Sequence, residues 1–253
     1  AGTSMFAMVV LEKPLSKVYP EIDMVATPDG KPVAMVHVNT CTSDLDAWVK
    51  LFAQLLEAAG ANLTKAQLYD MLYFQALEGD ADCGGLVSYN CYSGEPVTGL
   101  EEGRPLLVRQ PENKLTLPNF MRAQLYAAMA TLQIGMELLW AEDVQVEKLY
   151  GHGGLFKTKG VGQRLLAGAL GVPVAVMETA GEGGPWGMAL LAAYRKNRAQ
   201  GETLPQYLEQ RVFAGAAGDC VEPNPADREG FQRYIARYRA GLAVEKEAGK
   251  ALQ

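Results

Sequence analysis

A glycine-rich segment at residues 151–154 (GHGG) is the strongest chemical feature of the sequence. It follows a strand-like apolar run and precedes a run with helical spacing. Glycines let backbone N–H groups approach an anion closely, and a helix N-terminus favours negative charge. Lys157 and Lys159 follow directly and could add positive charge. The pattern predicts an anion-binding loop; a tight strand-to-helix turn without a ligand is the alternative.

A second short feature, Gly2-Thr3-Ser4, lies immediately before an apolar run at Met5–Leu11. A turn of this composition offers hydroxyl and backbone N–H groups to phosphate oxygens. Taken alone, the tripeptide is better explained as a frayed terminus. Because an apolar segment begins almost at once, we expect the chain to be part of a longer protein.

Dinucleotide binding is a competing interpretation of the glycine loop. Glu178 ends the next strand-like run, roughly where a Rossmann acid would meet a ribose. The third glycine position of that fingerprint is occupied by Phe156. Rossmann units also do not usually follow three antiparallel strands, so this interpretation is weaker.

Several carboxylates lie in loops or at expected helix starts, and we assign none of them as a catalytic base. We expect Asp44 and Asp46 to cap a helix and Asp80 and Asp82 to form a polar turn. Glu95 lies in the loop-rich segment that follows. The four cysteines show no CxxC spacing, which disfavours zinc and favours free thiols in a reducing cytoplasm. We therefore predict no protein-built metal site.

Charge and hydropathy exclude two classes of partner. The formal net charge is −6, which argues against nucleic acid or an anionic membrane surface. No apolar run approaches the roughly 20 residues that a membrane-spanning helix needs.

The elements that would position these loops can be read from apolar periodicity. Strand-like runs at 5–12, 21–27 and 31–38, with Pro-Asp-Gly before the third, predict an antiparallel meander. Capping-box patterns at Ser43 and Thr64 predict two helices. Residues 80–117 are rich in Gly, Pro and Asn and predict a loop-rich insertion with short strands at 86–89 and 106–109.

The second half alternates strands and helices. A helix from Pro118 is followed by a strand at 146–150, the glycine loop and a helix to Leu170. A strand at 172–177, a glycine-rich turn at 181–184 and helices at 185–197, 203–212 and 227–244 complete the chain. The order predicts an α/β fold with a mixed sheet, in which an antiparallel meander precedes strand–helix repeats.

Six segments in this order resemble the C-terminal domain of the FGGY carbohydrate kinases, a branch of the actin-like ATPases. The similar segments span nearly the whole chain: residues 2–4, 43–48, 92–96, 120–139, 151–171 and 172–192. The resemblance implies an actin-like ATPase (ribonuclease H-like) fold. Residues 1–253 would form one C-terminal nucleotide-binding domain of a two-domain kinase, with the insertion at about 80–117.

The resemblance also implies ATP and Mg²⁺ as cofactors and gives each matching residue a role. Thr3 would contact the β- and γ-phosphates, and Ser43 would lie at a helix start near the nucleotide. Gly153 and Gly154 would pack against the α-phosphate and adenosine, with Thr158 one turn later. His152 departs from the small residue usual in the family's glycine run.

The implied activity is transfer of the γ-phosphoryl group of ATP to a hydroxyl of a sugar, a ketopentose or a related one. The catalytic Asp and the sugar pocket would belong to an N-terminal domain, so this chain alone is expected to be inactive. ATP or ADP and, through that domain, the sugar are the expected partners; a homodimer is left open. The alternatives are a stand-alone nucleotide-binding or interaction module and the NAD-binding oxidoreductase domain.

Overall fold

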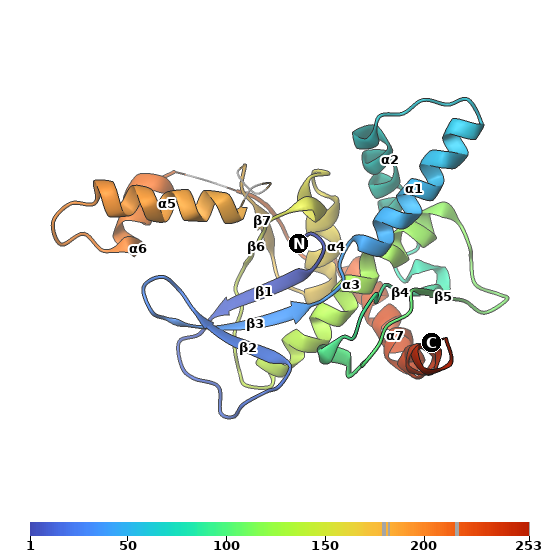
Figure 1. The fold of residues 1–253 in the computed structure, drawn as a ribbon, viewed down its shortest axis with the longest axis horizontal. Coiled ribbons are helices and arrows are strands. Elements are labelled where there is room, and N and C mark those ends of the chain that lie inside the picture. Colours follow the sequence, from blue (N-terminus) through green and yellow to red (C-terminus); the bar gives the residue numbers. More distant parts are fainter. Residues whose placement is uncertain (179–180, 182, 216–217, 253) are drawn as a thin grey trace.

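The structure, a computed structural model, describes residues 1–178, 181, 183–215 and 218–252. It opens with an antiparallel sheet of β1 (Met5–Val10), β2 (Ile22–Ala26) and β3 (Pro32–Val38) (Figure 1). The hairpin expected at Pro28-Asp29-Gly30 joins β2 to β3, as predicted. A simple meander is wrong, however, because β3 lies in the centre and β1 pairs with β3. The long connection from β1 to β2 leaves room for this order.

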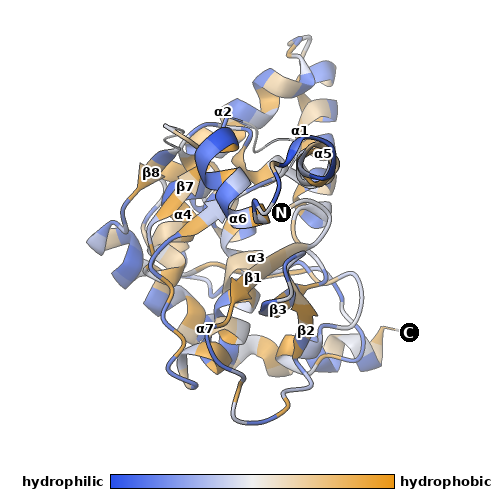
Figure 2. Ribbon diagram, turned by 90° about the vertical axis from the view of Figure 1, so that its left-hand side faces the viewer, coloured by the Kyte–Doolittle hydropathy of each residue, from blue (hydrophilic) through white to orange (hydrophobic). Residues whose placement is uncertain are grey.

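One face of this sheet is buried against the longest apolar helix, α3 (Leu117–Trp140). Alternate residues of β1 point into the core, as the period of two in a strand requires: Met5, Ala7 and Val9. Gly135 allows α3 to approach the sheet closely, because a Cβ there would lie 2.3 Å from Cγ1 of Val36. Figure 2 shows hydrophobic residues concentrated in β1–β3 and in the strands near α4.

Two helices, α1 (Ser43–Ala58) and α2 (Lys65–Glu78), form a hairpin that extends from the body (Figure 1). The capping box predicted at Thr64 is confirmed. The Thr64 hydroxyl accepts from the Gln67 N–H at 3.3 Å, and the Gln67 side chain accepts from the Thr64 N–H at 2.9 Å. These contacts satisfy two of the N–H groups that a helix start leaves unpaired.

The capping box predicted at Ser43 is wrong, although the helix begins there. Thr42 is the N-cap, and its side chain does not cap the helix. The carboxylates expected to cap it have other partners: Asp44 accepts from Trp48 Nε1 at 3.2 Å, and Asp46 accepts from the Tyr69 hydroxyl at 2.6 Å. Both hold aromatic rings of α1 and α2 in place.

The segment from 80 to 117 holds only short elements. They are the 3₁₀ turns η1 (Cys83–Gly85) and η2 (Pro96–Thr98) and the paired strands β4 (Val87–Tyr89) and β5 (Leu106–Val108). The two strands lie where the sequence predicted them. β4 is fully buried between α3 and α7 (Pro225–Ala251), so part of this segment belongs to the core.

The second half supplies the predicted strand–helix unit. β6 (Leu149–Gly151) pairs in parallel with β7 (Val174–Val176), and α4 (Val161–Leu170) forms the crossover. A third strand, β8 (Asp219–Val221), pairs antiparallel to β7 and was not predicted. The α/β class, with antiparallel strands first and a strand–helix unit after them, is confirmed. In the part of the chain that the structure describes, the strands form three small sheets, and the mixed one is β6-β7-β8.

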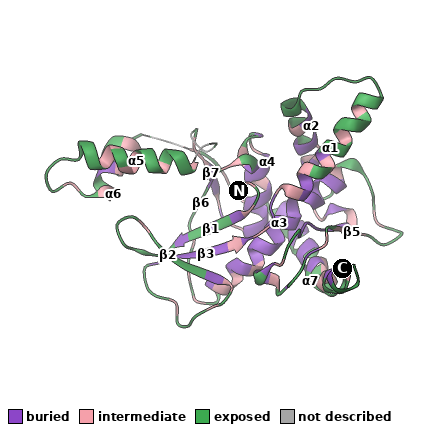
Figure 3. Cartoon of the chain, viewed as in Figure 1, coloured by how far each residue is buried: buried purple, intermediate pink, exposed green. Residues whose placement is uncertain are grey.

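The C-terminal part has an extended and a buried portion. α5 (Gly183–Asn197), α6 (Leu204–Tyr207) and the π turn η5 (Leu208–Val212) project from the body and are largely exposed (Figure 3). The glycine-rich turn predicted at 181–184 includes Glu182, which lies outside the described residues. The helix α7 packs on α4 and β4 through a buried stripe at helical spacing: Phe231, Tyr234, Ile235 and Tyr238.

A buried charge cluster joins three helices of the core. Asp227, near the start of α7, accepts from Arg122 of α3 and from Arg164 Nε of α4, the latter at 2.7 Å. Arg122 and Asp227 are each 1% exposed, so the contact is removed from water. Paired in this way, the charges fix the relative position of the helices. Among the described residues, no helix is long and apolar enough to span a bilayer.

Candidate functional site

The two short loops singled out in the sequence, residues 2–4 and 151–154, lie against each other. The nitrogen of Ala1 donates a hydrogen bond to the carbonyl of His152 at 2.7 Å. A Cβ on Gly153 would lie 2.0 Å from the carbonyl oxygen of Ala1, so only glycine permits this approach. The loops come from β1 and β6, two elements nearly 150 residues apart in the chain. They therefore form one surface.

The start of α1 completes this surface. The Cys41 N–H donates to the Thr3 carbonyl at 2.7 Å. The Thr42 N–H and hydroxyl both donate to the Gly2 carbonyl, at 3.2 and 2.9 Å. Since the Thr42 hydroxyl is used there, the N–H groups of the first turn of α1 have no side-chain cap. This helix end carries partial positive charge beside the two loops.

Four of the five predicted site residues lie around these contacts. Thr3 is exposed and Gly154 is exposed, whereas Gly153 is half-buried against Ala1. Ser43 is the first residue of α1 and is half-buried. The arrangement can present backbone N–H groups, hydroxyls and a helix end to an anion. The contacts of these residues with a nucleotide stay a prediction.

Thr158, the fifth predicted residue, is placed differently. Its hydroxyl donates to Asp70 Oδ1 of α2 at 2.6 Å, and the residue is 5% exposed. The structure thus brings Thr158 to α2 and not to the two loops. The contact ties the segment after the glycine loop to the α1–α2 hairpin.

The sequence pattern suggested that the glycine loop leads directly into a helix. In the structure it does not lead directly into α4. Gly154–Phe156 form a 3₁₀ turn, η3, and α4 begins only at Val161. The N-terminus of α4 is therefore separated from the loop by several residues. The start of α1, which has no side-chain cap, joins the first loop through Cys41 and Thr42, and sequence spacing alone did not indicate this.

A cavity of about 500 Å³ adjoins η3. Its wall combines aromatic and aliphatic side chains with charged ones: Phe156, Lys157, Lys159, Gln163, Val176, Met177, Glu178, Gly181 and Asp219. The Lys159 ammonium lies 2.8 Å from Asp219, and this hydrogen bond raises the pKa of Lys159. A partly apolar cleft of this size suits a flat heterocycle.

Asp44 is the carboxylate carried by the first turn of α1 next to Ser43. Asp44 is buried at the start of α1, where burial raises its pKa against hydrogen bonds from Trp48 and Tyr92 that lower it. Across the described ranges, no three His, Cys, Asp or Glu side chains gather as ligands for a metal ion. The surface thus presents hydrogen-bond donors more than carboxylates.

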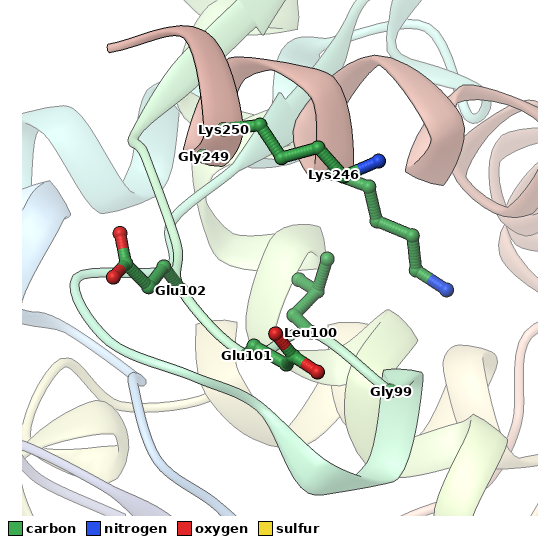
Figure 4. Close-up of a pocket in the computed structure, with 7 residues that line it drawn as sticks. All are labelled: Gly99, Leu100, Glu101, Glu102, Lys246, Gly249 and Lys250. Carbon is green, nitrogen blue, oxygen red and sulfur yellow. The ribbon is translucent and has the colours of Figure 1, made fainter. Parts of the chain in front are cut away.

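A second cavity, of about 400 Å³, lies between residues 99–102 and the end of α7 (Figure 4). Lys246 and Lys250 of α7 line this cavity together with Glu101 and Glu102 of the loop (Figure 4), and the Lys250 ammonium also lies 3.6 Å from Glu247 of its own helix. Opposite charges therefore line the same space. This cavity lies in a different part of the fold from the glycine loops and shares no residue with them.

Sequence reasoning missed the residues that hold the loops together. Cys41 and Thr42 act through backbone groups and a hydroxyl, and they follow β3 without a recognisable motif. Phe156 was noted only because it breaks a dinucleotide fingerprint, and it lines the cavity. Asp219 belongs to the unpredicted strand β8. The sequence signal that could have located Cys41 and Thr42 is the apolar run before residue 39, because it predicts the strand that these residues follow.

Comparison with known proteins gives a family match. Residues 1–195 match the model of the FGGY family of carbohydrate kinases, C-terminal domain. A search among curated protein sequences finds no match.

Solved structures with the same fold are kinases about twice as long. A xylulose kinase from Lactobacillus acidophilus has 18% identity and a TM-score of 0.69; the match covers 97% of this chain and 47% of the kinase. A gluconate kinase from Lactobacillus acidophilus has 18% identity and a TM-score of 0.72, with 98% and 47% covered. A Plasmodium falciparum glycerol kinase with ADP has 14% identity and a TM-score of 0.63, with 97% and 46% covered. The chain spans about half the length of these kinases.

Proposed function

The chain belongs to the FGGY family of carbohydrate kinases, and from this premise we propose that it is the nucleotide-binding part of an ATP-dependent sugar kinase. Together with a second domain it would transfer the γ-phosphoryl group of ATP to a hydroxyl of a sugar. The observation that carries this proposal is the contact between the two glycine loops at Ala1 and Gly153. Phosphoryl transfer depends on positioning and charge stabilisation, which such loops supply.

We assign the phosphates to the surface made by the loops and the start of α1. Thr3 would hold the β- and γ-phosphates through its exposed hydroxyl and its backbone N–H. Ser43 would contribute from the first turn of α1, where the helix end favours negative charge. Gly153 and Gly154 would lie against the α-phosphate. Thr158 would not contact the nucleotide, because its hydroxyl is used to hold the neighbouring segment on Asp70 of α2.

The adenosine would occupy the cavity next to η3. Its position two residues beyond the glycine loop and its partly apolar wall support this assignment. Phe156 and Met177 would contact the base, whose flat face suits such side chains. Glycerol kinase from Plasmodium falciparum, which has a similar fold, was solved with ADP.

Mg²⁺ would reach this site bound to the nucleotide. The donor-rich surface fits phosphate oxygens, and the described residues around it supply no cluster of carboxylates that could hold a bare ion. In this role the ion would neutralise charge on the phosphates. The chain's own groups would bind and orient the phosphates.

The sugar and the catalytic base are proposed to lie in the other domain. Asp44, at the start of α1, is buried and already hydrogen-bonded to Trp48. We therefore assign no carboxylate of the described loops as the catalytic base. We propose a ketopentose or a related sugar, because a xylulose kinase and a gluconate kinase share the fold. All four cysteines are free thiols, which supports a cytoplasmic protein.

Isothermal titration calorimetry of the chain with Mg-ATP, Mg-ADP, AMP and NAD tests the proposal. We expect binding of ATP and ADP, weaker binding of AMP and none of NAD. Thr3→Ala should weaken ATP binding, and Thr27→Ala, in the distant β2–β3 turn, is the matched control. NAD binding tighter than ATP binding, or no adenine nucleotide binding, contradicts the proposal. Ketopentose phosphorylation by the chain alone would contradict the location of the base.

A further inference from the structure

The turn between β3 and α1, residues 39–42, is held from behind by a buried asparagine. Asn90 is 2% exposed and follows β4 directly. Its side-chain Nδ2 donates to two successive carbonyls, those of Thr40 at 3.1 Å and Cys41 at 3.0 Å. A single side chain thus fixes two peptide units of a turn that lies outside any helix or sheet.

A buried glutamate holds the preceding residue of the same turn. Glu95 is 1% exposed, and its Oε2 accepts from the Asn39 N–H at 2.8 Å. The Asn39 side chain returns a hydrogen bond to the Gly94 carbonyl at 2.6 Å. The second carboxylate oxygen, Oε1, is buried without a hydrogen-bond partner among the described residues. Residues 39–41 are therefore clamped by 90–95 at three successive positions.

On its other side the same turn carries the proposed phosphate loop. Cys41 donates to the Thr3 carbonyl and Thr42 donates to the Gly2 carbonyl. Cys41 therefore links Asn90 to Thr3: its carbonyl accepts from the Asn90 side chain, and its N–H donates to the Thr3 carbonyl. Gly2 and Thr3 lie outside any strand, so these contacts, with that of Ala1 to His152, set their position.

We propose that Asn90 and Glu95 are positioning residues for nucleotide binding: they hold the 39–42 turn and through it place Gly2 and Thr3 to receive the β- and γ-phosphates. This inference rests on the proposed function of the loops. A precise backbone position matters here because a small displacement of a phosphate-binding group weakens its contact strongly.

Asn90 and Glu95, with the hydrogen bonds that they make to residues 39–41, are called the clamp below. The chemistry of these two side chains supports a role in positioning the turn and not in packing alone. A buried polar atom without a hydrogen-bond partner lowers stability, so a glutamate is a poor choice for filling space at position 95. An apolar side chain of similar size would avoid this cost but could not hold the Asn39 N–H. Asn90 is likewise the side chain that can donate twice from one nitrogen to adjacent carbonyls.

Nucleotide titrations of four variants test the clamp. Glu95→Ala and Asn90→Ala each remove part of it, and Glu95→Gln keeps an acceptor for the Asn39 N–H. Asn113→Ala is the matched control, because Asn113 lies in the same insertion and accepts only from the local Gln110 N–H. Calorimetry with ATP and with AMP separates the phosphate loop from the adenosine cavity, since AMP lacks the β- and γ-phosphates.

We expect ATP affinity to fall roughly tenfold in Glu95→Ala and Asn90→Ala, the equivalent of about one lost hydrogen bond. AMP affinity should stay within about twofold. Glu95→Gln and Asn113→Ala should bind ATP like the unsubstituted chain. Equal loss of ATP and AMP affinity, or unchanged ATP affinity in both alanine variants, overturns the inference. An unsubstituted chain that binds neither nucleotide overturns the proposed function instead.

Amide hydrogen exchange gives a readout that needs no nucleotide. In Glu95→Ala and Asn90→Ala, the amides of Cys41 and Thr42, which donate to the Thr3 and Gly2 carbonyls, should exchange faster, while those of α7 keep their protection. Should Asn90→Ala fail to fold, the comparison of Glu95→Ala with Glu95→Gln decides. Unchanged exchange at Cys41 and Thr42 in the folded alanine variant overturns the inference.

Discussion

The carbonyl oxygen of Ala1 lies 2.0 Å from the place that a Cβ atom on Gly153 would take. The backbone of Gly153 has φ 99° and ψ −170°, a region that essentially only glycine adopts. Two independent constraints, one steric and one conformational, thus require glycine at this position. The meeting of the two loops depends on it.

Gly153→Ala should therefore destabilise the chain and separate the loops. The backbone conformation alone costs about 1–3 kcal/mol, and the clash with Ala1 adds to it. The matched control is Gly154→Ala, because a Cβ on Gly154 meets no atom within 4 Å. Urea denaturation without nucleotide should show a clear loss for Gly153→Ala and a change within about 0.5 kcal/mol for Gly154→Ala. Equal losses would show that the tight approach at Gly153 is not required.

The sequence predicted the loops better than their surroundings. The strand before residue 151 and the apolar run from Met5 were legible because glycine-rich turns and strand patterns are local signals. Their contact was not predictable from the residues, since it depends on a long-range approach of Ala1 to Gly153. The pairing of β1 with β3 was missed for the same reason.

Polar residues were harder to interpret than apolar ones. Asp44 and Asp46 fit a capping pattern by spacing, but a carboxylate can serve equally well as an acceptor for a distant aromatic side chain, as Asp46 does for Tyr69. Thr158 was given its role by the family resemblance, whereas its hydroxyl lies against Asp70 of α2. For Asp46 and Thr158 the hydrogen-bond partner belongs to another element, which the pattern of one segment cannot reveal.

The stability of the chain should fall between about pH 4.5 and pH 7 through Glu95. Burial raises the pKa of Glu95 to about 7, while the hydrogen bond from the Asn39 N–H opposes the rise. The unfolded chain then binds fewer protons than the native one over this interval, so the free energy of unfolding decreases as pH rises. The contribution is fully present below pH 4.5, is lost by about pH 7, and amounts to at most about 3 kcal/mol.

Glu95→Gln isolates this effect because it removes the titrating group and keeps an acceptor. The difference in free energy of unfolding between the unsubstituted chain and Glu95→Gln should shift in favour of Glu95→Gln as pH rises from 4.5 to 7. Urea denaturation at half-unit steps of pH measures it. A difference that stays constant across the interval would show that the native carboxyl titrates at its ordinary pKa.

Thr158→Val should cost stability and leave nucleotide contacts intact. The substitution keeps the shape and removes the hydroxyl that donates to Asp70 at 2.6 Å, a bond to a charged acceptor worth about 1.5–3 kcal/mol. Thr158→Ser, which retains the donor, is the control. Denaturation should separate the two variants, whereas ATP affinity under native conditions should agree between them within about twofold. A selective loss of ATP affinity in Thr158→Val would place this hydroxyl on the nucleotide.

Asp227→Asn should be among the most damaging substitutions in the core. Burial by itself raises the pKa of Asp227, but hydrogen bonds and charges from Arg164 and Arg122 outweigh it and lower the pKa. Neutralising the carboxylate leaves the buried Arg122 guanidinium without a counter-charge, at a cost of about 3–5 kcal/mol. The same cost develops in the unsubstituted chain in acid, since the stabilisation is lost as pH falls through the lowered pKa.

Glu229→Gln supplies the comparison on the same helix. Glu229 pairs with Arg233 at 2.9 Å, but both side chains are more than half exposed, so the change should cost less than about 1 kcal/mol. Urea denaturation at pH 7 should rank Asp227→Asn far below Glu229→Gln. Small and equal losses for both would mean that the cluster of Asp227 with Arg122 and Arg164 contributes little to holding α3, α4 and α7 together.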